Sequence, residues 1–250
     1  MNATLEVMTT PISSSQMEIG NIAQWAAAGA TFLAVLVALF KDEILRWWRR
    51  PALLVSIDLR PPDCQKTKLD YKVQRTTLIY GSADCYYLRL WVSNTGRTRA
   101  ERVQVFAAKL FRRTADGTFK QVESFLPMNL RWAHGQQGLR GPEIFADGIS
   151  PDMGKHCDLG RVIDPAHHEN LGEILPNIEA SQSVLALDLE VTPNTKSHLV
   201  GPGVYQLHLR IAAANCAPIE KVIELTITGK WFADQNEMFS DGLGIKIIHQ

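Results

Sequence analysis

The side chains in this sequence that are best suited to acid–base chemistry are histidines in a glycine-rich stretch. His134, His156 and His167 all lie within residues 133–180, and an imidazole can act as a general base near neutral pH. One hypothesis is therefore a hydrolase or nucleotide-sensing effector with its site in this stretch. No Gly-x-Ser-x-Gly elbow, His-Glu-x-x-His pair or P-loop accompanies the histidines, so the motifs assign no catalytic residue.

Cysteines are the other reactive side chains, at Cys64, Cys85, Cys157 and Cys216. An exported protein could pair them as two disulfides, whereas in the cytoplasm they remain thiols. His156 precedes Cys157, and His167 and His168 are adjacent, but no Cys-x-x-Cys or His-x₃-His pair supplies metal ligands at the usual spacing. We therefore predict no metal site and no cofactor.

The charge pattern gives no indication of a nucleic-acid partner. The 26 Lys and Arg residues balance 26 Asp and Glu residues, so no overall field attracts a polyanion. Arg97, Arg99 and Arg102 cluster beside Asn94. Because no aromatic residue suited to base stacking flanks them, we interpret the cluster as a solvated turn and expect no nucleic acid to bind.

A long apolar segment near the N-terminus must fix where the remaining chain is held. Ile22 to Phe40 are 19 residues without a charge, and as a helix they would cover about 30 Å, the thickness of the hydrocarbon core of a bilayer. A soluble helix of this length would show a polar stripe, which is missing here. The segment predicts a transmembrane helix.

The order of residues around this segment differs from that of a cleavable signal. Residues 1–40 contain no Lys or Arg, and the small residues 26–29 precede the bulky apolar run instead of following it. Basic residues occur only on the C-terminal flank, whereas the N-terminal side carries Glu6 and Glu18. The positive-inside rule therefore predicts a single-pass protein of the cell (inner) membrane, with the N-terminus outside and residues 51–250 in the cytoplasm.

Residues typical of membrane interfaces flank the span on both sides. These interface candidates are Trp25, Lys41, Arg46, Trp47, Trp48, Arg49 and Arg50. Since Pro51 disfavours helical geometry in the residue before it, we expect the helix to end at Arg49. The predicted boundaries are a short extracytoplasmic tail at 1–18, a transmembrane and juxtamembrane helix at 19–50, and one domain at 51–250.

Small residues recur every fourth position inside the span, at Ala26, Ala30, Ala34 and Ala38. This spacing lets a second helix approach closely and permits a homo-oligomer, although alanine is also simply common in membrane helices. The span contains no acid, base or histidine, so a transporter, proton relay or channel is not indicated.

The remaining 200 residues show strand periodicity more than helical periodicity. Apolar and polar residues alternate in several segments, which is the pattern of antiparallel strands with one buried face. The expected strands lie at 53–59, 86–92, 185–191, 205–211 and 223–227. We predict an all-β sandwich with long loops at 61–84 and 133–180, the latter being either a binding surface or a solvated excursion.

Two stretches resemble a known module. "YYLRLWVSNTGRTRAERVQVFAAKL", Tyr86 to Leu110, is similar to the strand–turn–strand unit of CARDB-like immunoglobulin-type domains, with Asn94 and Gly96 in the turn. "GPGVYQLHLRI", from Gly201, is similar to a late sandwich strand. There Gly203 would turn the chain and the Tyr205 hydroxyl would bind upstream backbone as a tyrosine corner.

With its anchor, the chain resembles uncharacterised bacterial single-pass membrane proteins that carry such an immunoglobulin-like sandwich. The resemblance implies architecture and a partner-binding role, and it transfers no active site. We therefore expect a non-catalytic module that engages the lipid bilayer and a protein partner at the cytoplasmic membrane surface. The alternatives are the hydrolase or effector described above, tethered to the membrane, and an exported adhesive domain with reversed topology and disulfides.

Overall fold

A long helix precedes a β domain in this chain. The computed structural model describes residues 16–72, 80–134 and 144–248. Helix α1 (Gln16–Arg49) ends two residues before Pro51, as the proline predicts. The chain divides into two compact units at this point, Met1–Arg49 and Arg50–Gln250. The expected tail at 1–18 lies mostly outside the described residues.

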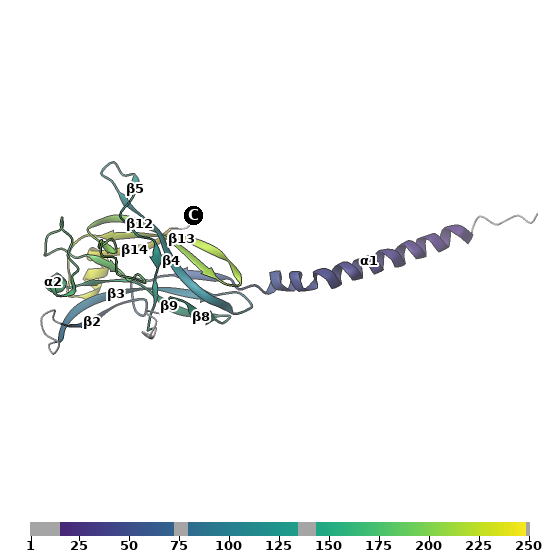
Figure 1. The fold of residues 1–250 in the computed structure, drawn as a ribbon, viewed down its shortest axis with the longest axis horizontal. Helices are drawn as coiled ribbons and strands as arrows, with labels where there is room; N and C mark the ends of the chain where they lie inside the picture. The colour runs from purple at the N-terminus through teal and green to yellow at the C-terminus, as the bar shows by residue number, and fades with distance from the viewer. Residues whose placement is uncertain (1–15, 73–79, 135–143, 249–250) are drawn as a thin grey trace, which may run out of the picture. The chain divides into compact units, whose positions relative to one another are not determined.

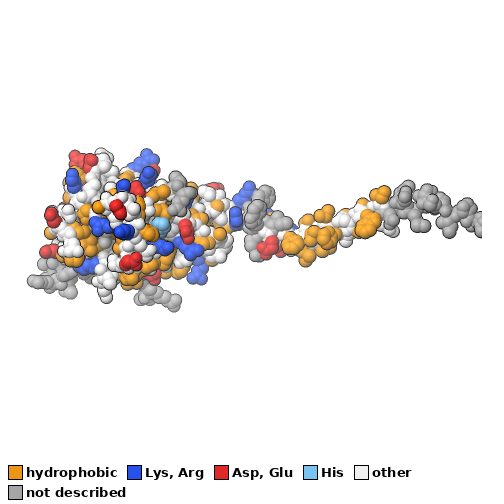
Figure 2. Space-filling model, turned by 90° about the horizontal axis from the view of Figure 1, so that it is seen from above, with side chains coloured by type: hydrophobic (Ala, Val, Ile, Leu, Met, Phe, Trp, Pro, Cys, Tyr) orange, Lys and Arg blue, Asp and Glu red, His pale blue; other side chains and the backbone are white. Residues whose placement is uncertain are grey.

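The described side chains of α1 from Ile22 to Phe40 are mostly apolar, and nearly all of them are exposed. The stretch Ile22–Glu43 is long and apolar enough to cross a membrane, and none of it is buried. Large apolar side chains such as Trp25 (75% exposed) and Phe32 point to the surroundings, and apolar side chains line this part of the helix in Figure 2. A helix of this composition near the N-terminus is either a membrane span or a signal sequence.

The β domain contains two antiparallel sheets that face each other (Figure 1). In the first sheet the strand order is β1-β3-β9-β10-β11, while β2 pairs with β3 and β7 pairs with β9. Its strands are β1 (Leu53–Ser56), β2 (Cys64–Lys72), β3 (Tyr80–Asn94), β7 (Arg131–Trp132), β9 (Met153–Ile163), β10 (Leu185–Leu187) and β11 (Leu199–Val200).

The second sheet has the order β14-β13-β12-β4-β5, and β6 and β8 both pair with β4. Its strands are β4 (Ala100–Arg113), β5 (Phe119–Gln121), β6 (Met128–Asn129), β8 (Ala146–Ile149), β12 (Gly203–Ala213), β13 (Cys216–Ile227) and β14 (Leu243–Ile248). Short helical turns occur in two connections: η1 (Pro165–His167) with α2 (His168–Leu171), and α3 (Gln235–Glu237) with η2 (Met238–Gly242).

A hydrophobic core fills the space between the two sheets. Strand β3 shows how the sequence builds it, because Tyr86, Leu88, Leu90 and Val92 alternate along the strand and are fully buried. Residues of the second sheet such as Leu207 belong to the same core. The predicted all-β sandwich behind an apolar helix is therefore confirmed, and it leaves the other face of β3 free for polar side chains.

Residues 61–84, expected to be a loop, instead contain β2 and the beginning of β3. Strand β2 pairs with β3 from Cys64↔Leu88 to Lys72↔Tyr80. Its sequence, CQKTKLDYK, carries polar residues at most positions, so the alternation of apolar residues that reveals a half-buried strand is weak.

The expected loop at 133–180 likewise contains β8, β9, η1 and α2. Strand β9 lies in the middle of the first sheet, between β3 and β10. Asp158 and Arg161 interrupt its apolar pattern, which is why the sequence resembles a loop. The Gly-Pro-Gly segment at 201–203 connects β11 of the first sheet with β12 of the second sheet.

Candidate functional site: an ionic cluster on the first sheet

Polar side chains gather on the outer face of the first sheet, the face turned away from the core. The pleat that buries Leu88 and Leu90 directs Tyr87, Arg89 and Trp91 outward. In the register of β3 with β9, Tyr87 lies opposite Arg161, Arg89 opposite Asp158, and Trp91 opposite His156. Residues far apart in the sequence therefore become direct cross-strand neighbours.

We define the ionic cluster as the set of charged and imidazole side chains that form four pairs on this face. The pairs are His156–Asp63, Arg89–Asp158, Arg131–Asp188 and Arg161–Glu173. On the face of the domain that Figure 2 shows, positive and negative side chains lie next to one another without a large area of one sign.

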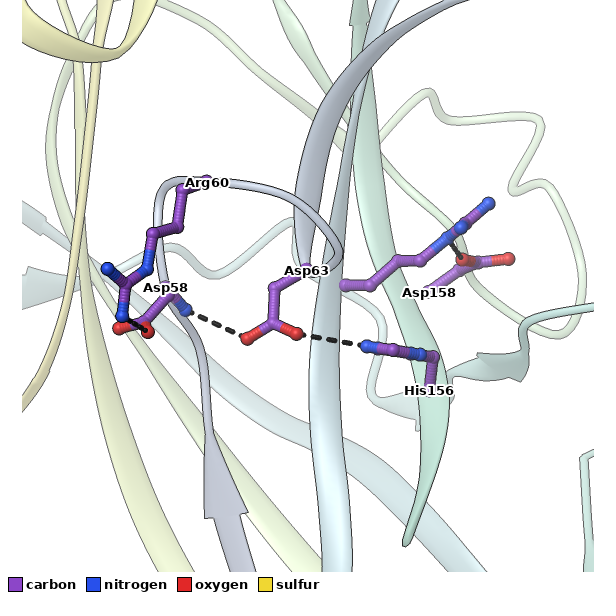
Figure 3. Close-up of polar contacts among 6 residues, drawn as sticks. Asp58, Arg60, Asp63, His156 and Asp158 are labelled. Carbon is purple, nitrogen blue, oxygen red and sulfur yellow. Dashed lines mark hydrogen bonds and ion pairs between the residues drawn. The ribbon is translucent and has the colours of Figure 1, made fainter.

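The first pair joins β9 to the loop before β2. His156 Nε2 lies 2.9 Å from Asp63 Oδ1, and because a carboxylate oxygen accepts, Nε2 carries the proton. The other Asp63 oxygen accepts the Asp58 backbone N–H at 3.0 Å, so the carboxylate is held from both sides (Figure 3). The His156 ring also packs against Trp91 with ring centroids 4.7 Å apart.

The second and third pairs lie along the middle of the sheet. Arg89 Nε donates to Asp158 Oδ1 at 2.9 Å, and the two side chains are only 14% and 13% exposed. Arg131 Nη1 approaches Asp188 Oδ1 at 3.4 Å, while its Nη2 donates to the Glu190 carbonyl at 3.1 Å. Each guanidinium is therefore held against a partly buried carboxylate, where water screens the charges less than at an open surface.

The fourth pair closes one side of a cleft. Arg161 Nη2 donates to Glu173 Oε1 at 2.6 Å, and Glu173 is 3% exposed. The cleft has a volume of about 340 Å³, and its charged and imidazole lining residues are Arg131, Arg161, Glu173, Asp188, Lys196 and His198. Both signs of charge therefore face the same small space.

Burial dominates the ionisation of three acids of the cluster. It raises the pKa of Asp158, Asp188 and Glu173 above their ordinary values, although the neighbouring guanidinium groups oppose the change. Burial lowers the pKa of His198, and the nearby Arg161 and Lys196 lower it further. His198 is therefore neutral at pH 7.

Several atoms of the cleft residues have no hydrogen-bond partner in the described part of the chain. They are Arg131 Nε, Arg161 Nε, Glu173 Oε2 and His198 Nδ1. Buried donors and acceptors are normally satisfied, and leaving them unpaired costs stability. The arrangement is suited to recognition through hydrogen bonds and charge.

The structure does not gather the three predicted histidines in one site. His134, exposed after β7, follows Ala133, whose N–H donates to the His156 carbonyl at 3.0 Å, whereas His167 lies beyond the other end of β9. His167 Nδ1 is hydrogen-bonded to the Tyr71 hydroxyl at 2.8 Å, and that hydroxyl also accepts from Asn170 at 3.2 Å. Among the described residues, no serine, threonine or cysteine forms a hydrogen bond with His156.

The described cysteines are all free thiols. Burial raises the pKa of Cys64 to about 12 and that of Cys85 to about 11, and it raises the pKa of Cys157 strongly. Cys216 is half-buried. The two disulfides of the exported alternative are not formed, and the buried thiols are poor nucleophiles because a thiolate is the reactive form.

The predicted turn residues have clear structural roles at the end of β3. The fully buried Asn94 side chain donates to the Thr98 and Ile149 carbonyls at 2.7 and 3.0 Å, and accepts from the Ala52 and Gly96 amides at 3.1 and 3.0 Å. At Gly96, a Cβ would come within 2.4 Å of the Ala52 nitrogen. Glycine is needed there because the backbone segments approach closely.

The other predicted corner has a different geometry. Gly203 begins β12 and Tyr205 follows inside it, with its ring buried and the Arg112 guanidinium 5.7 Å above. Across the described residues, the Tyr205 hydroxyl makes no hydrogen bond, so the expected bond to upstream backbone is not present there.

The predicted membrane-interface residues lie along or just after α1. Trp25, Lys41, Arg49 and Arg50 are exposed, whereas the side chains of Arg46, Trp47 and Trp48 lie outside the described part of the structure. The four repeated alanines between positions 26 and 38 are exposed on the helix.

Sequence reasoning missed the ionic cluster except for His156. Arg89 looked like an ordinary solvent-facing residue of a strand, and its partner Asp158 lies 69 residues further along the chain. A weak local signal existed, because charged residues inside "HCDLGRVI" would be costly in a buried strand unless they were paired.

Comparisons with models of protein families, with curated proteins and with solved structures found no match to this chain.

Proposed function

We propose that this chain is a single-pass membrane protein whose β-sandwich binds a protein partner at the cytoplasmic membrane surface without catalysing a reaction. The observation that carries the proposal is the row of Tyr87, Arg89 and Trp91 on the outer face of the first sheet, backed by the ionic cluster. Aromatic residues and arginine contribute most of the binding energy in many protein interfaces.

The geometry of this row supports recognition of a folded surface. The Trp91 ring lies across β9 at Gly154, where a Cβ would come within 2.4 Å of the ring. The Arg89 guanidinium lies 5.4 Å from the centroid of the Tyr87 ring. The ion pair with Asp158 fixes Arg89, and the packed His156 ring holds Trp91, so less entropy is lost on binding. A partner carrying both acidic and basic groups complements the mixed charges of the cluster.

The exposed apolar surface of α1 supports the anchor, and the basic residues from Lys41 to Arg50 support a cytoplasmic β domain in the inner membrane. Tethering raises the local concentration of the domain near other membrane proteins, so that weak contacts suffice. We further propose that the sandwich is related to CARDB-like immunoglobulin-type modules, because Asn94 and Gly96 organise the turn after β3.

The His156–Asp63 pair is the observation that favours the second candidate, a membrane-tethered hydrolase or effector. A carboxylate that orients an imidazole supplies two of the three members of a catalytic triad. His156→Ala discriminates between the two functions. It should abolish the cellular phenotype of a hydrolase. A binding module should lose less function with this change than with Trp91→Ala, because His156 there only packs behind the Trp91 ring.

Site-specific photo-crosslinking in native membranes tests the binding proposal. A photoreactive amino acid at Ser93, two residues beyond Trp91 on the same face of β3, should give a discrete adduct with another protein. The adduct should disappear when Trp91→Ala is added. The matched control places the same amino acid at Lys120, exposed in β5 of the second sheet. Equal adducts from both positions, or none from Ser93, would contradict the proposal.

A further inference from the structure

A second cavity lies next to the short helices η1 and α2, the second of which is labelled in Figure 1. Residues of the segment 164–184 form most of its lining, and Trp231 completes it. It has a volume of about 620 Å³ and shares only Glu173 with the cleft of the ionic cluster. We call it the acidic cavity, after its ionisable lining residues Asp164, His168, Glu169, Glu173 and Glu179. Because its walls belong to the β domain alone, what it binds does not depend on the proposed protein partner.

The charges that line this cavity are negative. Four carboxylates face it, and its lining includes no Lys or Arg among the described residues. Arg161 neutralises Glu173, whereas Asp164, Glu169 and Glu179 form no ion pair within the described ranges. Burial lowers the pKa of His168, so its imidazole is neutral at pH 7. The cavity is therefore an environment that attracts a cation.

Two deeply buried polar side chains at the cavity lack hydrogen-bond partners. Glu173 is 3% exposed and His168 is 5% exposed, and Glu173 Oε2 and His168 Nε2 have no partner in the described part of the chain. Buried polar atoms are normally paired. An acceptor on Glu173 and an imidazole nitrogen on His168 could both be satisfied by a ligand that donates hydrogen bonds.

The rest of the lining is apolar. Leu175, Ile178 and Val184 belong to a small apolar cluster of their own, and Trp231 contributes an indole ring. Cations are attracted to the faces of indole rings. Small-molecule sites typically measure about 300–1,000 Å³ and combine apolar walls with a few polar groups, and this cavity fits that description.

We propose that the acidic cavity binds a small organic cation, a protonated amine carried on an apolar body. The ammonium group would lie among the carboxylates and the apolar body against Leu175, Ile178 and Trp231. A metal ion is a poorer fit, because the described residues contain no group of three or more His, Cys, Asp or Glu side chains placed to hold one.

Calorimetric titration of the full-length chain in mild detergent tests this proposal with three probes that share one apolar body: phenethylamine, 2-phenylethanol and phenylacetate. Titration into protein-free micelles removes the contribution of partitioning. We expect phenethylamine to bind about tenfold or more tightly than the alcohol, and phenylacetate to bind most weakly, because only the ammonium group is attracted by the carboxylates. Equal affinity for the three probes would overturn the proposal.

A charge-neutralised variant, Asp164→Asn with Glu169→Gln and Glu179→Gln, should weaken phenethylamine binding about tenfold and leave 2-phenylethanol binding nearly unchanged. Asparagine at position 164 retains the ability to cap η1. The matched control neutralises one exposed Asp and two exposed Glu elsewhere, Asp147→Asn with Glu123→Gln and Glu237→Gln.

Equal weakening by both triple variants would show a non-specific charge effect and overturn the proposal. If the cavity triple variant does not unfold cooperatively, the single change Glu179→Gln at the exposed rim replaces it. That variant should weaken phenethylamine binding selectively by about threefold, and unchanged binding would count as refutation.

Discussion

The Arg161 guanidinium donates to one oxygen of the buried Glu173 carboxylate at 2.6 Å, while the second oxygen of that carboxylate has no partner in the described residues. Glu173 lies between the cleft of the ionic cluster and the acidic cavity, and it lines both. A buried carboxylate that is only half satisfied is costly to keep ionised. Its ionisation should therefore be visible in the stability of the domain.

Stability should fall with rising pH because of Glu173. Burial raises the pKa of this carboxyl above 4.5, so the folded state retains a proton that the unfolded state has released. The stabilisation is fully present below pH 4.5 and is lost as pH rises through the folded-state pKa. Urea unfolding between pH 4 and 7 should show wild-type losing stability relative to Glu173→Gln. Glu123→Gln, at an exposed position, serves as the control. Parallel pH profiles for wild-type and Glu173→Gln would show that this carboxyl ionises normally.

Removing one partner of the Arg89–Asp158 pair should be more harmful than removing both. Arg89→Leu leaves Asp158 as an unpaired, largely buried charge, at a cost of about 3–5 kcal/mol. The double variant Arg89→Leu with Asp158→Leu should recover most of that loss, because no unpaired charge remains. Unfolding free energies of the four proteins, measured by tryptophan fluorescence in urea, complete the cycle. Additive losses would mean that the pair is not coupled.

Asn94→Ala should destabilise the domain by about 3 kcal/mol or more, because four buried hydrogen bonds are lost at once and their backbone partners are left unsatisfied. Asn94→Asp should be intermediate, since a carboxylate still accepts from the Ala52 and Gly96 amides but cannot donate. Urea unfolding of the full-length chain in detergent provides the comparison. A loss for Asn94→Ala no larger than about 0.5 kcal/mol, typical of a surface change, would rule out this structural role.

The thiols should react in two classes. Cys64, Cys85 and Cys157 are buried, whereas Cys216 is only half-buried, so a thiol reagent at pH 8 should titrate only Cys216 in the native chain. That reaction should be slower than for a free thiol, because burial raises the pKa of Cys216 too. All four cysteines should react in denaturant. Fast reaction of more than one thiol in the folded protein would indicate an opened core.

The strands whose apolar residues alternate cleanly were predictable from the sequence. Residues 205–211 and 223–227 lie within β12 and β13 as expected, because alternation reports directly on a half-buried strand. Strands β2 and β9 were not predictable in this way, because charged residues break their apolar alternation. Lys66 in β2 and Asp158 in β9 are stabilised by ion pairs with Asp84 and Arg89 of the neighbouring strand β3.

The candidate site was less predictable than the fold. His156 stood out by residue type, but its partner Asp63 lies 93 residues earlier in the chain. The pairing depends on the register between β3 and β9, and on the loop that leads into β2, neither of which leaves a local signal. The acidic cavity, similarly, requires Trp231 to approach residues 164–184. Local motifs cannot encode such contacts, because they arise from tertiary packing.

We propose that α1 crosses the inner membrane and holds the β domain on the cytoplasmic side. This topology is tested most directly by labelling intact cells with a membrane-impermeant maleimide, using a Cys216→Ser background and one added cysteine. Ser13→Cys should be labelled in intact cells, and Glu123→Cys, exposed on the β domain, only after lysis. Labelling of Glu123→Cys without lysis, or loss of the residue-13 label through N-terminal cleavage, would contradict the account.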